Sequence, residues 1–211
     1  MEQMRRKLKE YAEVTIQQEN LCGKLNFPRV FGRLTPVHLE IGSGKGTFLV
    51  HQAAAFPEIS FLGIEWARKY YLLAVDRIGR HGLENVRIIR TDAAVFLREF
   101  VHEVSVDCFH IYFPDPWPKK RHHKRRLLQS ANVEVLLRRL KPNGRIQIAT
   151  DHAEYFQQIR EVMSAYRTKL DPVEFERPAG AEEGELTGTN YERKYVKNHR
   201  PIHAAAYRKH A

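Results

Sequence analysis

The chain has 211 residues, of which 43% are hydrophobic and 28% are charged, and this composition predicts a soluble globular protein and excludes a disordered one. The formal net charge is +10, and six of the positive charges lie in one run of eight residues, 119–126, which suits a phosphate-binding surface. No segment is apolar over the length of a membrane span, so an integral membrane protein is excluded as well.

Cysteine and histidine usage bears on compartment and metal binding. Cys22 and Cys108 lie 86 positions apart and offer no disulfide framework, so we expect a protein of the reducing cytoplasm. The eleven histidines are scattered, and the pair His122 and His123 has no cysteine or carboxylate at ligand spacing. We therefore expect no metal site.

The predicted elements divide the chain near residue 35. Residues 1–35 show no strand-like alternation and are expected to form an N-terminal tail or flap, with a charged helix over 1–18. The main domain is expected over 36–211. Apolar segments predict strands at 37–41, 59–64, 86–90, 106–113 and 145–149, and amphipathic segments predict helices at 47–56, 67–81, 93–101, 124–140 and 153–166. One or two further strands are expected within 191–207.

Five alternations of strand and helix predict the α/β class, with a doubly wound and mostly parallel sheet. Ligands of such sheets bind beyond the carboxyl ends of the strands. Acidic residues fall on those ends in this sequence: Glu40, Glu65, Asp92, Asp115 and Asp151.

The first strand leads into a glycine-rich turn that indicates a nucleotide-like ligand. Gly42, Gly44 and Gly46 follow the G-x-G-x-G spacing, which differs from the G-x-G-x-x-G of dinucleotide sites. Glu40 precedes them and favours a cationic ligand over a diphosphate, so S-adenosylmethionine fits better than NAD. Glu65 is placed to bind ribose hydroxyls, and Asp92 ends the third strand within reach of a base edge.

The segment 112–118 carries three prolines, which exclude both helix and continued strand. It holds Asp115 beside Trp117 and is followed directly by the basic run. Alone, each half is typical of a proline-rich turn or of a solvated helix, and Trp117 can either stack on a base or pack in the core. Together, at a strand end, the two halves predict a site for a nucleic-acid base.

These motifs resemble the bacterial tRNA (guanine-N7)-methyltransferases. The resemblance covers about residues 30–197 and rests on segments 39–46, 63–65, 91–93, 113–122, 149–151 and 189–192. It implies a class I, Rossmann-like, S-adenosylmethionine-dependent methyltransferase domain that methylates N7 of a guanine in the variable loop of tRNA. Asn190 departs from the acidic residue of the family motif, and residues 199–211 match no family pattern.

The resemblance also implies a role for each site residue. The cofactor would be lined by Glu40, Gly42, Gly44, Gly46, Glu65, Asp92 and Asp115, of which Asp115 is also the candidate catalytic residue. The substrate would be bound by Lys119, Asp151, Thr189, Tyr191 and Glu192. The charge pattern adds candidate contacts to the tRNA backbone: Lys120, Arg121, Lys124, Arg125 and Arg126.

The expected chemistry needs alignment more than proton transfer. Guanine N7 carries a free lone pair, so no proton has to be removed before it attacks a methyl group. Asp115 can accept hydrogen bonds from guanine N1–H and N2–H, which adenine does not offer together. Methylation of an exocyclic amine, a non-catalytic RNA-binding protein on the same fold and an NAD-dependent dehydrogenase stay open as alternatives, as does the choice between monomer and homodimer.

Overall fold

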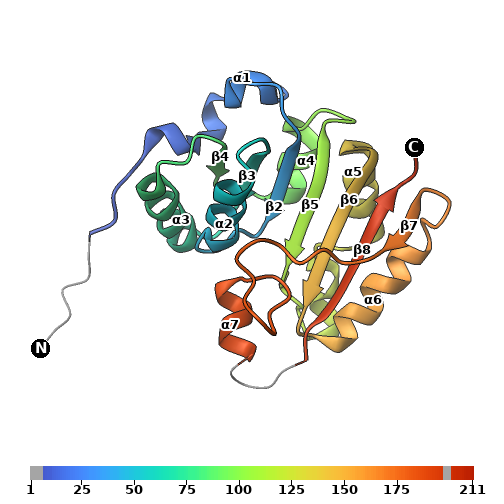
Figure 1. Ribbon diagram of the computed structural model, residues 1–211. Coiled ribbons are helices and arrows are strands. Elements are labelled where there is room, and N and C mark those ends of the chain that lie inside the picture. The colour runs from blue at the N-terminus through green and yellow to red at the C-terminus, as the bar shows by residue number, and fades with distance from the viewer. Residues whose placement is uncertain (1–6, 197–200) are drawn as a thin grey trace, which may run out of the picture.

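The computed structural model describes residues 7–196 and 201–211. Over these residues the chain forms an eight-stranded sheet with the order β1-β4-β3-β2-β5-β6-β8-β7 (Figure 1). Five neighbouring pairs are parallel, and only β8 runs antiparallel to its two neighbours within this described sheet. The strands are β1 (Thr15–Ile16), β2 (Val37–Ile41), β3 (Ser60–Ile64), β4 (Val86–Ile89), β5 (Val106–Tyr112), β6 (Leu140–Thr150), β7 (Leu170–Val173) and β8 (His203–Lys209).

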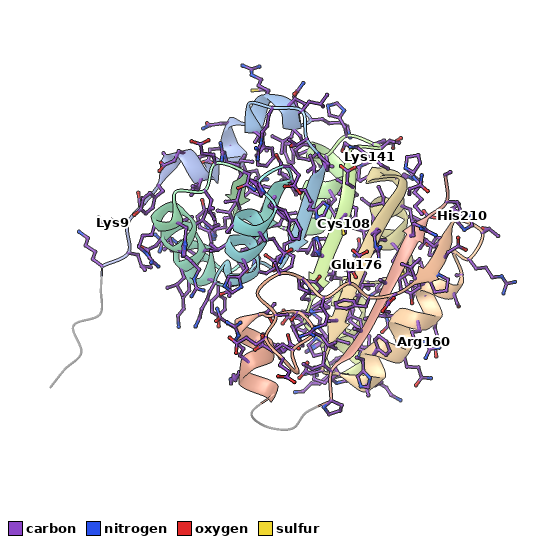
Figure 2. All side chains as sticks on the ribbon, in the orientation of Figure 1. Lys9, Cys108, Lys141, Arg160, Glu176 and His210 are labelled. Carbon is purple, nitrogen blue, oxygen red and sulfur yellow. The ribbon has the colours of Figure 1, made fainter. Side chains whose placement is uncertain are left out.

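Helices cover the two faces of the sheet, and this confirms the predicted doubly wound α/β class. Buried side chains of α4, α5 and α6 pack against one face, and those of α2 and α3 pack against the other. Side chains fill the layers between them, with Cys108 inside and Arg160 and His210 at the surface (Figure 2). The helices are η1 (Ala12–Val14), η2 (Gln18–Asn20), α1 (Phe27–Phe31), α2 (Thr47–Ala55), α3 (Arg68–His81), α4 (Ala93–Phe100), η3 (Lys120–Arg125), α5 (Ser130–Arg139), α6 (Ala153–Ser164) and α7 (Asn190–Val196).

Three predicted elements differ from the structure. The helix expected over 124–140 begins only at Ser130, because a 3-10 helix occupies Lys120–Arg125 and the chain is extended at Arg126. The extended structure expected over 191–207 is one strand, β8, preceded by the helix α7. The helix expected over 1–18 is wrong for its described part, 7–18, which holds η1 and β1, while residues 1–6 lie outside the described residues.

The segment before residue 35 packs on the domain. β1 forms one edge of the sheet and pairs with β4, and Val14, Leu25, Phe27 and Phe31 are buried among the core side chains. Burial of four large apolar side chains stabilises this attachment by several kcal/mol, at roughly 1.5–3 kcal/mol each. In the part of the chain that the structure describes, no helix has the length and apolarity to cross a membrane.

A long loop takes the place of a helix on one part of the sheet. After β7, the chain crosses the faces of β8, β6 and β5 before it reaches α7 (Figure 1). Gln147 on β6 holds this loop by accepting a hydrogen bond from the Glu176 amide at 3.3 Å, and Gln52 on α2 donates one to the Ala179 carbonyl at 2.9 Å. The loop thereby carries residues 186–192 to the carboxyl ends of the strands.

Candidate functional site

The glycine-rich turn after β2 depends on left-handed backbone. Gly44 and Gly46 have φ values of 54° and 70°, which side chains rarely adopt. At Gly46 a Cβ atom would also lie 3.0 Å from the Cβ of Ala74 on α3, so this glycine permits close packing of the turn on the helix. The turn therefore keeps its backbone exposed to a ligand at the carboxyl end of the sheet.

Glu65 orders that turn from the end of β3. Its carboxylate accepts hydrogen bonds from the Gly44 amide at 2.8 Å and the Ala67 amide at 2.7 Å. Burial raises the pKa of Glu65, while these two hydrogen bonds oppose the rise and the charge of Asp115 adds to it. The carboxylates of Glu65 and Asp115 thus belong to one electrostatic environment although they end different strands.

Glu40 carries an unusual carboxylate at the end of β2. Its Oε2 atom is buried and has no hydrogen-bond partner among residues 7–196 and 201–211. Burial raises the pKa of Glu40 to about 8, so the group is mostly neutral near pH 7 unless a cation binds beside it. A buried oxygen without a partner beside a glycine-rich turn fits a cationic ligand, such as the ammonium group of S-adenosylmethionine.

Asp92 and Asp151 follow the strands β4 and β6. The Oδ1 atom of Asp92 accepts a hydrogen bond from the Val95 amide at 2.9 Å and caps α4, and the side chain is exposed. Asp151 is half-buried one residue after the end of β6. Both carboxylates lie on the sheet edge that also carries Glu40 and Glu65, as the sequence predicts.

The proline-rich loop after β5 is strained and presents Asp115 to solvent. Phe113 and Trp117 have φ values of 51° and 43°, which are uncommon for residues other than glycine. Asp115 lies between them and is exposed, and Lys119 is exposed just beyond. Trp117 is half-buried, with the guanidinium of Arg125 5.0 Å from its ring centroid.

Arg126 corrects the prediction that every cation of the basic run contacts tRNA. Its side chain is fully buried, and its Nε donates to the Pro116 carbonyl at 2.7 Å. Its two Nη atoms donate to the Glu154 carboxylate at 3.0 and 2.7 Å, and it also bonds Gln158. Arg126 therefore ties the proline-rich loop to α6 and has no donor facing a phosphate. The exposed cations of the run are Lys119, Lys120, Arg121, Lys124 and Arg125.

The segment 189–192 comes from the far end of the chain and joins the site. The ring of Tyr191 packs on the ring of Phe113, with 4.7 Å between centroids. The Asn190 amide donates to the hydroxyl of Thr47, the first residue of α2 after the glycine-rich turn. The Thr189 hydroxyl accepts from the Glu192 amide at 3.1 Å and caps α7. Segment 189–192 thus bridges the turn and the proline-rich loop.

Glu192 corrects a second prediction, that of direct substrate contact. The residue is fully buried, and its carboxylate accepts from the backbone amides of residues 186–188 and from the hydroxyl of Thr187. With both oxygens occupied inside the loop, Glu192 positions its neighbours and does not face the site. A sequence signal exists for this arrangement, because Thr189 and Glu192 have the Thr-x-x-Glu spacing that is typical of a capped helix start.

Sequence reasoning missed the two contacts that hold the loops. The Arg126–Glu154 pair and the Asn190–Thr47 contact join segments 28 and 143 positions apart, so no local pattern reveals them. The only signal for Arg126 is that Leu127 and Leu128 follow it, which indicates that the chain turns inward there.

A family model described as "Putative methyltransferase" matches residues 34–205. The chain is similar to proteins named tRNA (guanine-N(7)-)-methyltransferase from three bacteria. Identity to the Nitrosococcus oceani protein is 46% over 68% of this chain and 61% of the relative. Identity to the Nitrosomonas eutropha protein is 47%, over 67% of this chain and 63% of the relative. Identity to the Alkalilimnicola ehrlichii protein is 38%, over 88% of this chain and 77% of the relative. The matched part of the chain thus spans somewhat less than two thirds of the first two relatives.

Solved structures share the fold at low identity. An aminoglycoside resistance methyltransferase, NpmB1, superposes with a TM-score of 0.59 at 15% identity, over 87% of this chain and 91% of that chain. An S-adenosylmethionine-dependent O-methyltransferase from Thermotoga maritima superposes with a TM-score of 0.55 at 16% identity, over 89% of this chain and 67% of that chain. At this identity the likeness shows the Rossmann-like methyltransferase fold and nothing about substrate.

Proposed function

Because the chain belongs to the tRNA (guanine-N7)-methyltransferase family, we propose that it transfers the methyl group of S-adenosylmethionine to N7 of a guanine in the variable loop of tRNA. The observation that carries the proposal is the exposed carboxylate of Asp115, held on a strained loop between the glycine-rich turn and the basic run. Such a carboxylate can bind a guanine ring at the cofactor site. The two free cysteines suit a reducing cytoplasm, where we place the reaction.

The proposed cofactor fits the residues at the carboxyl ends of β2, β3 and β4. Glu40 offers a buried carboxylate oxygen to an ammonium group, and Glu65 and Asp92 offer acceptors to ribose hydroxyls and a base edge. S-adenosylmethionine supplies, when bound, a methyl group on a positively charged sulfur. The remaining task of the protein is to bring a nucleophile into line with that methyl group.

Asp115 is proposed to orient the guanine. Its two oxygens can accept hydrogen bonds from N1–H and N2–H of guanine. Adenine lacks this pair of donors, so the contact selects guanine over adenine. N7 attacks with its own lone pair, so no side chain has to remove a proton first. The ring gains positive charge during the transfer, and a fixed carboxylate stabilises that charge more in the transition state than in the ground state.

The exposed part of the basic run is proposed to bind the tRNA backbone. Lys120, Arg121, Lys124 and Arg125 lie on η3, directly after the proline-rich loop. Phosphate contacts from these side chains offset the cost of turning a base out of the folded RNA, which amounts to a few kcal/mol. Lys119, Asp151 and the bridge formed by residues 189–191 are proposed to complete the substrate site.

The test is a methyl-transfer assay with unmodified tRNA transcript and isotope-labelled S-adenosylmethionine, followed by nucleoside mass spectrometry. We expect labelled 7-methylguanosine, and we expect it to disappear when the variable-loop guanine is replaced by adenine. Label on an exocyclic amine would replace the proposed reaction with amine methylation. Tight tRNA binding without any transfer would refute an enzymatic function.

A further inference from the structure

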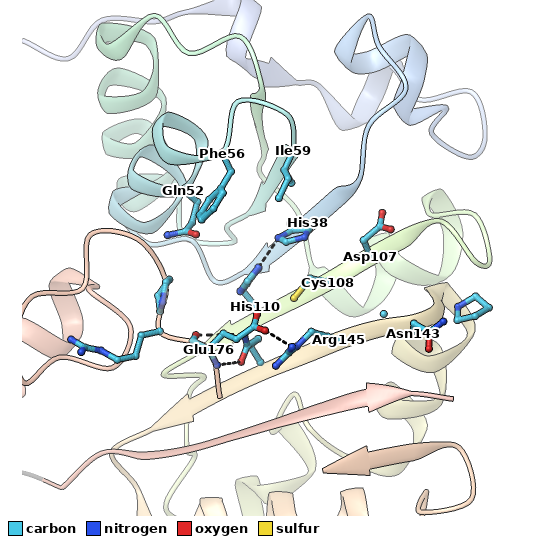
Figure 3. Close-up of a pocket in the computed structure, with 15 residues that line it drawn as sticks. His38, Gln52, Phe56, Ile59, Asp107, Cys108, His110, Asn143, Arg145 and Glu176 are labelled. Atoms are coloured by element: carbon cyan, nitrogen blue, oxygen red, sulfur yellow. Dashed lines mark hydrogen bonds and ion pairs between the residues drawn. The ribbon is translucent and has the colours of Figure 1, made fainter. Parts of the chain in front are cut away.

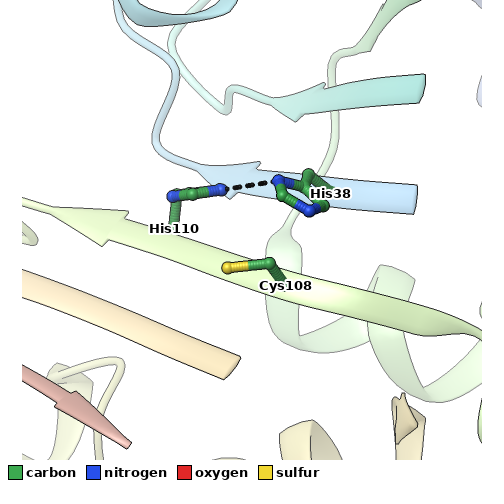
Figure 4. Close-up of side chains that lie close together, drawn as sticks. All are labelled: His38, Cys108 and His110. Atoms are coloured by element: carbon green, nitrogen blue, oxygen red, sulfur yellow. Dashed lines mark hydrogen bonds between the residues drawn. The ribbon is translucent and has the colours of Figure 1, made fainter. Parts of the chain in front are cut away.

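Three potential metal ligands meet on one face of the sheet, beneath the turn. His38 on β2 and Cys108 on β5 are register partners, and His110 follows two residues later on the same face of β5. One ligand atom from each of the three lies within 4.8 Å of the others, and Figure 4 shows the three side chains together. The parallel pairing of β2 and β5 thus joins residues that lie 70 and more positions apart in the sequence.

The two histidines already have a ligand-like geometry. Nε2 of His110 and Nδ1 of His38 share a hydrogen bond of 3.1 Å, so one of the two nitrogens carries a proton in the metal-free protein. Two nitrogens bound to one tetrahedral Zn²⁺ at about 2.05 Å lie about 3.3 Å apart, so an ion that replaces this hydrogen bond changes the separation of the two nitrogens little once the bridging proton has moved to the other nitrogen of its ring. Nδ1 of His110 lies 2.9 Å from the Tyr112 hydroxyl, and when it donates there, Nε2 keeps its lone pair. Such an outer hydrogen bond is typical of metal-bound histidine.

Burial keeps both imidazoles in the form that binds metals. It lowers the pKa of His38 to about 4 and the pKa of His110 as well, so both rings are neutral at pH 7. Burial also raises the pKa of the Cys108 thiol, which therefore carries its proton until a cation displaces it. A cluster of two neutral imidazoles and one thiol is a soft-to-borderline donor set, which suits zinc better than magnesium or calcium.

The cluster lines a cavity that reaches solvent. This cavity measures about 420 Å³ and lies where the loop after β7 replaces a helix, between the strands and Glu176 (Figure 3). Gln52 of α2 and Phe56, the residue after α2, close one side, and Arg145 of β6 closes another. A hydrated ion can therefore approach His38 and Cys108 without unfolding of the domain.

We propose that His38, Cys108 and His110 bind one Zn²⁺ ion, with a water molecule from the cavity as fourth ligand. Binding forms two Zn–N bonds and one Zn–S bond, and the Cys108 thiol releases one proton to solvent. The ion would join β2 to β5 close to the glycine-rich turn. Glu40, which lies two residues before that turn, is the register partner of His110. This link between the two strands is the role that we assign to the ion, and the ion takes no part in the proposed methyl transfer. The sequence predicts no metal site because the ligands share no local spacing.

The experiment uses the full chain after treatment with a chelator, titrated with Co²⁺ and then Zn²⁺. We expect one Co²⁺ per chain with a thiolate-to-cobalt charge-transfer band in the near ultraviolet, and displacement of that band by Zn²⁺. Calorimetry of Zn²⁺ binding in buffers of different ionisation enthalpy should give about one proton released per ion. Zn²⁺ should raise the melting temperature by several degrees, since it binds the folded state.

Three variants make the outcome decisive. Cys108→Ala should lose the charge-transfer band and the thermal shift, whereas Cys22→Ala, which removes the exposed cysteine, should keep both. His38→Gln gives a second reading if Cys108→Ala does not fold, and it should weaken Co²⁺ binding at least tenfold while the thiolate band weakens with it. The proposal is overturned if the wild type shows no thiolate band, or if Cys22→Ala removes the band and Cys108→Ala keeps it. Methyl transfer is not a readout here, so failure of this site leaves the proposed function untouched.

Discussion

Replacement of Glu192 by glutamine tests whether this residue positions the site or binds the substrate. The carboxylate accepts from the Leu186, Thr187 and Gly188 amides and from the Thr187 hydroxyl, and the residue has no exposed surface. A glutamine keeps one oxygen and turns the other acceptor into a donor, so at least one backbone N–H then faces another N–H. Charge-assisted hydrogen bonds contribute about 1.5–3 kcal/mol each, so we expect a local loss of about 3–5 kcal/mol.

Hydrogen exchange measures that loss where it occurs. A loss of 3–5 kcal/mol corresponds to a fall of at least about 100-fold in protection of the amides of residues 186–188. Methyl transfer should fall in parallel, because the same loop carries Asn190 to Thr47 and Tyr191 to Phe113. Glu183→Gln, an exposed acid in the same loop, is the matched control and should change neither quantity. Loss of methyl transfer with unchanged exchange of these amides would refute the positioning role and restore direct substrate contact.

Three further predictions concern the proposed reaction and the stability of the site. Asp115→Asn should lower kcat for 7-methylguanosine formation at least about 100-fold while tRNA affinity changes less than threefold, and equal losses of both would argue against orientation of the base. Joint replacement of Arg121, Lys124 and Arg125 by glutamine should weaken tRNA binding and reduce its log–log salt slope by between about 2 and 3, whereas an unchanged slope would make these cations mere solvated charges. Glu40→Gln should raise the melting temperature of chelator-treated, cofactor-free protein at pH 8 but not at pH 4.5. The pKa of Glu40 is about 8 in the folded chain against 4.5 ordinarily, so the wild type loses stability as the pH rises from 4.5 to 8, by at most about 5 kcal/mol. Equal melting temperatures of wild type and Glu40→Gln at pH 8 would contradict this.

Much of the fold could be predicted because its signals are local. Strand and helix alternate with clear periodicity from residue 37 to 164, and Gly82 ends α3 in left-handed conformation as a C-cap should. Parallel strands in a doubly wound sheet end on one edge, so the acids Glu40, Glu65 and Asp92 could be assigned to that edge from their positions alone. The hydrogen-bond partners of these acids, by contrast, depend on how the loops pack in the folded chain.

Two of the errors concern residues whose environment is set by hydrogen bonds of the folded chain. Arg126 looks like one more cation in a basic run, but the carboxylate of Glu154 and the carbonyl of Pro116 draw it inside. Residues 191–196 have strand-forming aromatic residues, yet Thr189 and Glu192 cap a helix there. In both cases a hydrogen bond made in the folded chain outweighs a local preference of a few tenths of a kcal/mol.

The proline-rich loop shows how strain and support combine to fix one carboxylate. Left-handed backbone at Phe113 and Trp117 costs about 1–2 kcal/mol at each residue, so the loop would relax unless its surroundings held it. Arg126 holds the Pro116 carbonyl from inside, and the rings of Tyr191 and Trp117 are packed against Phe113 and Arg125. Support therefore comes from α6, from the segment at α7 and from η3. Asp115 lies between the two strained residues, so if the proposed function holds, a displacement of this carboxylate by about 1 Å should lower the rate of transfer about 100-fold, because in-line transfer depends on alignment.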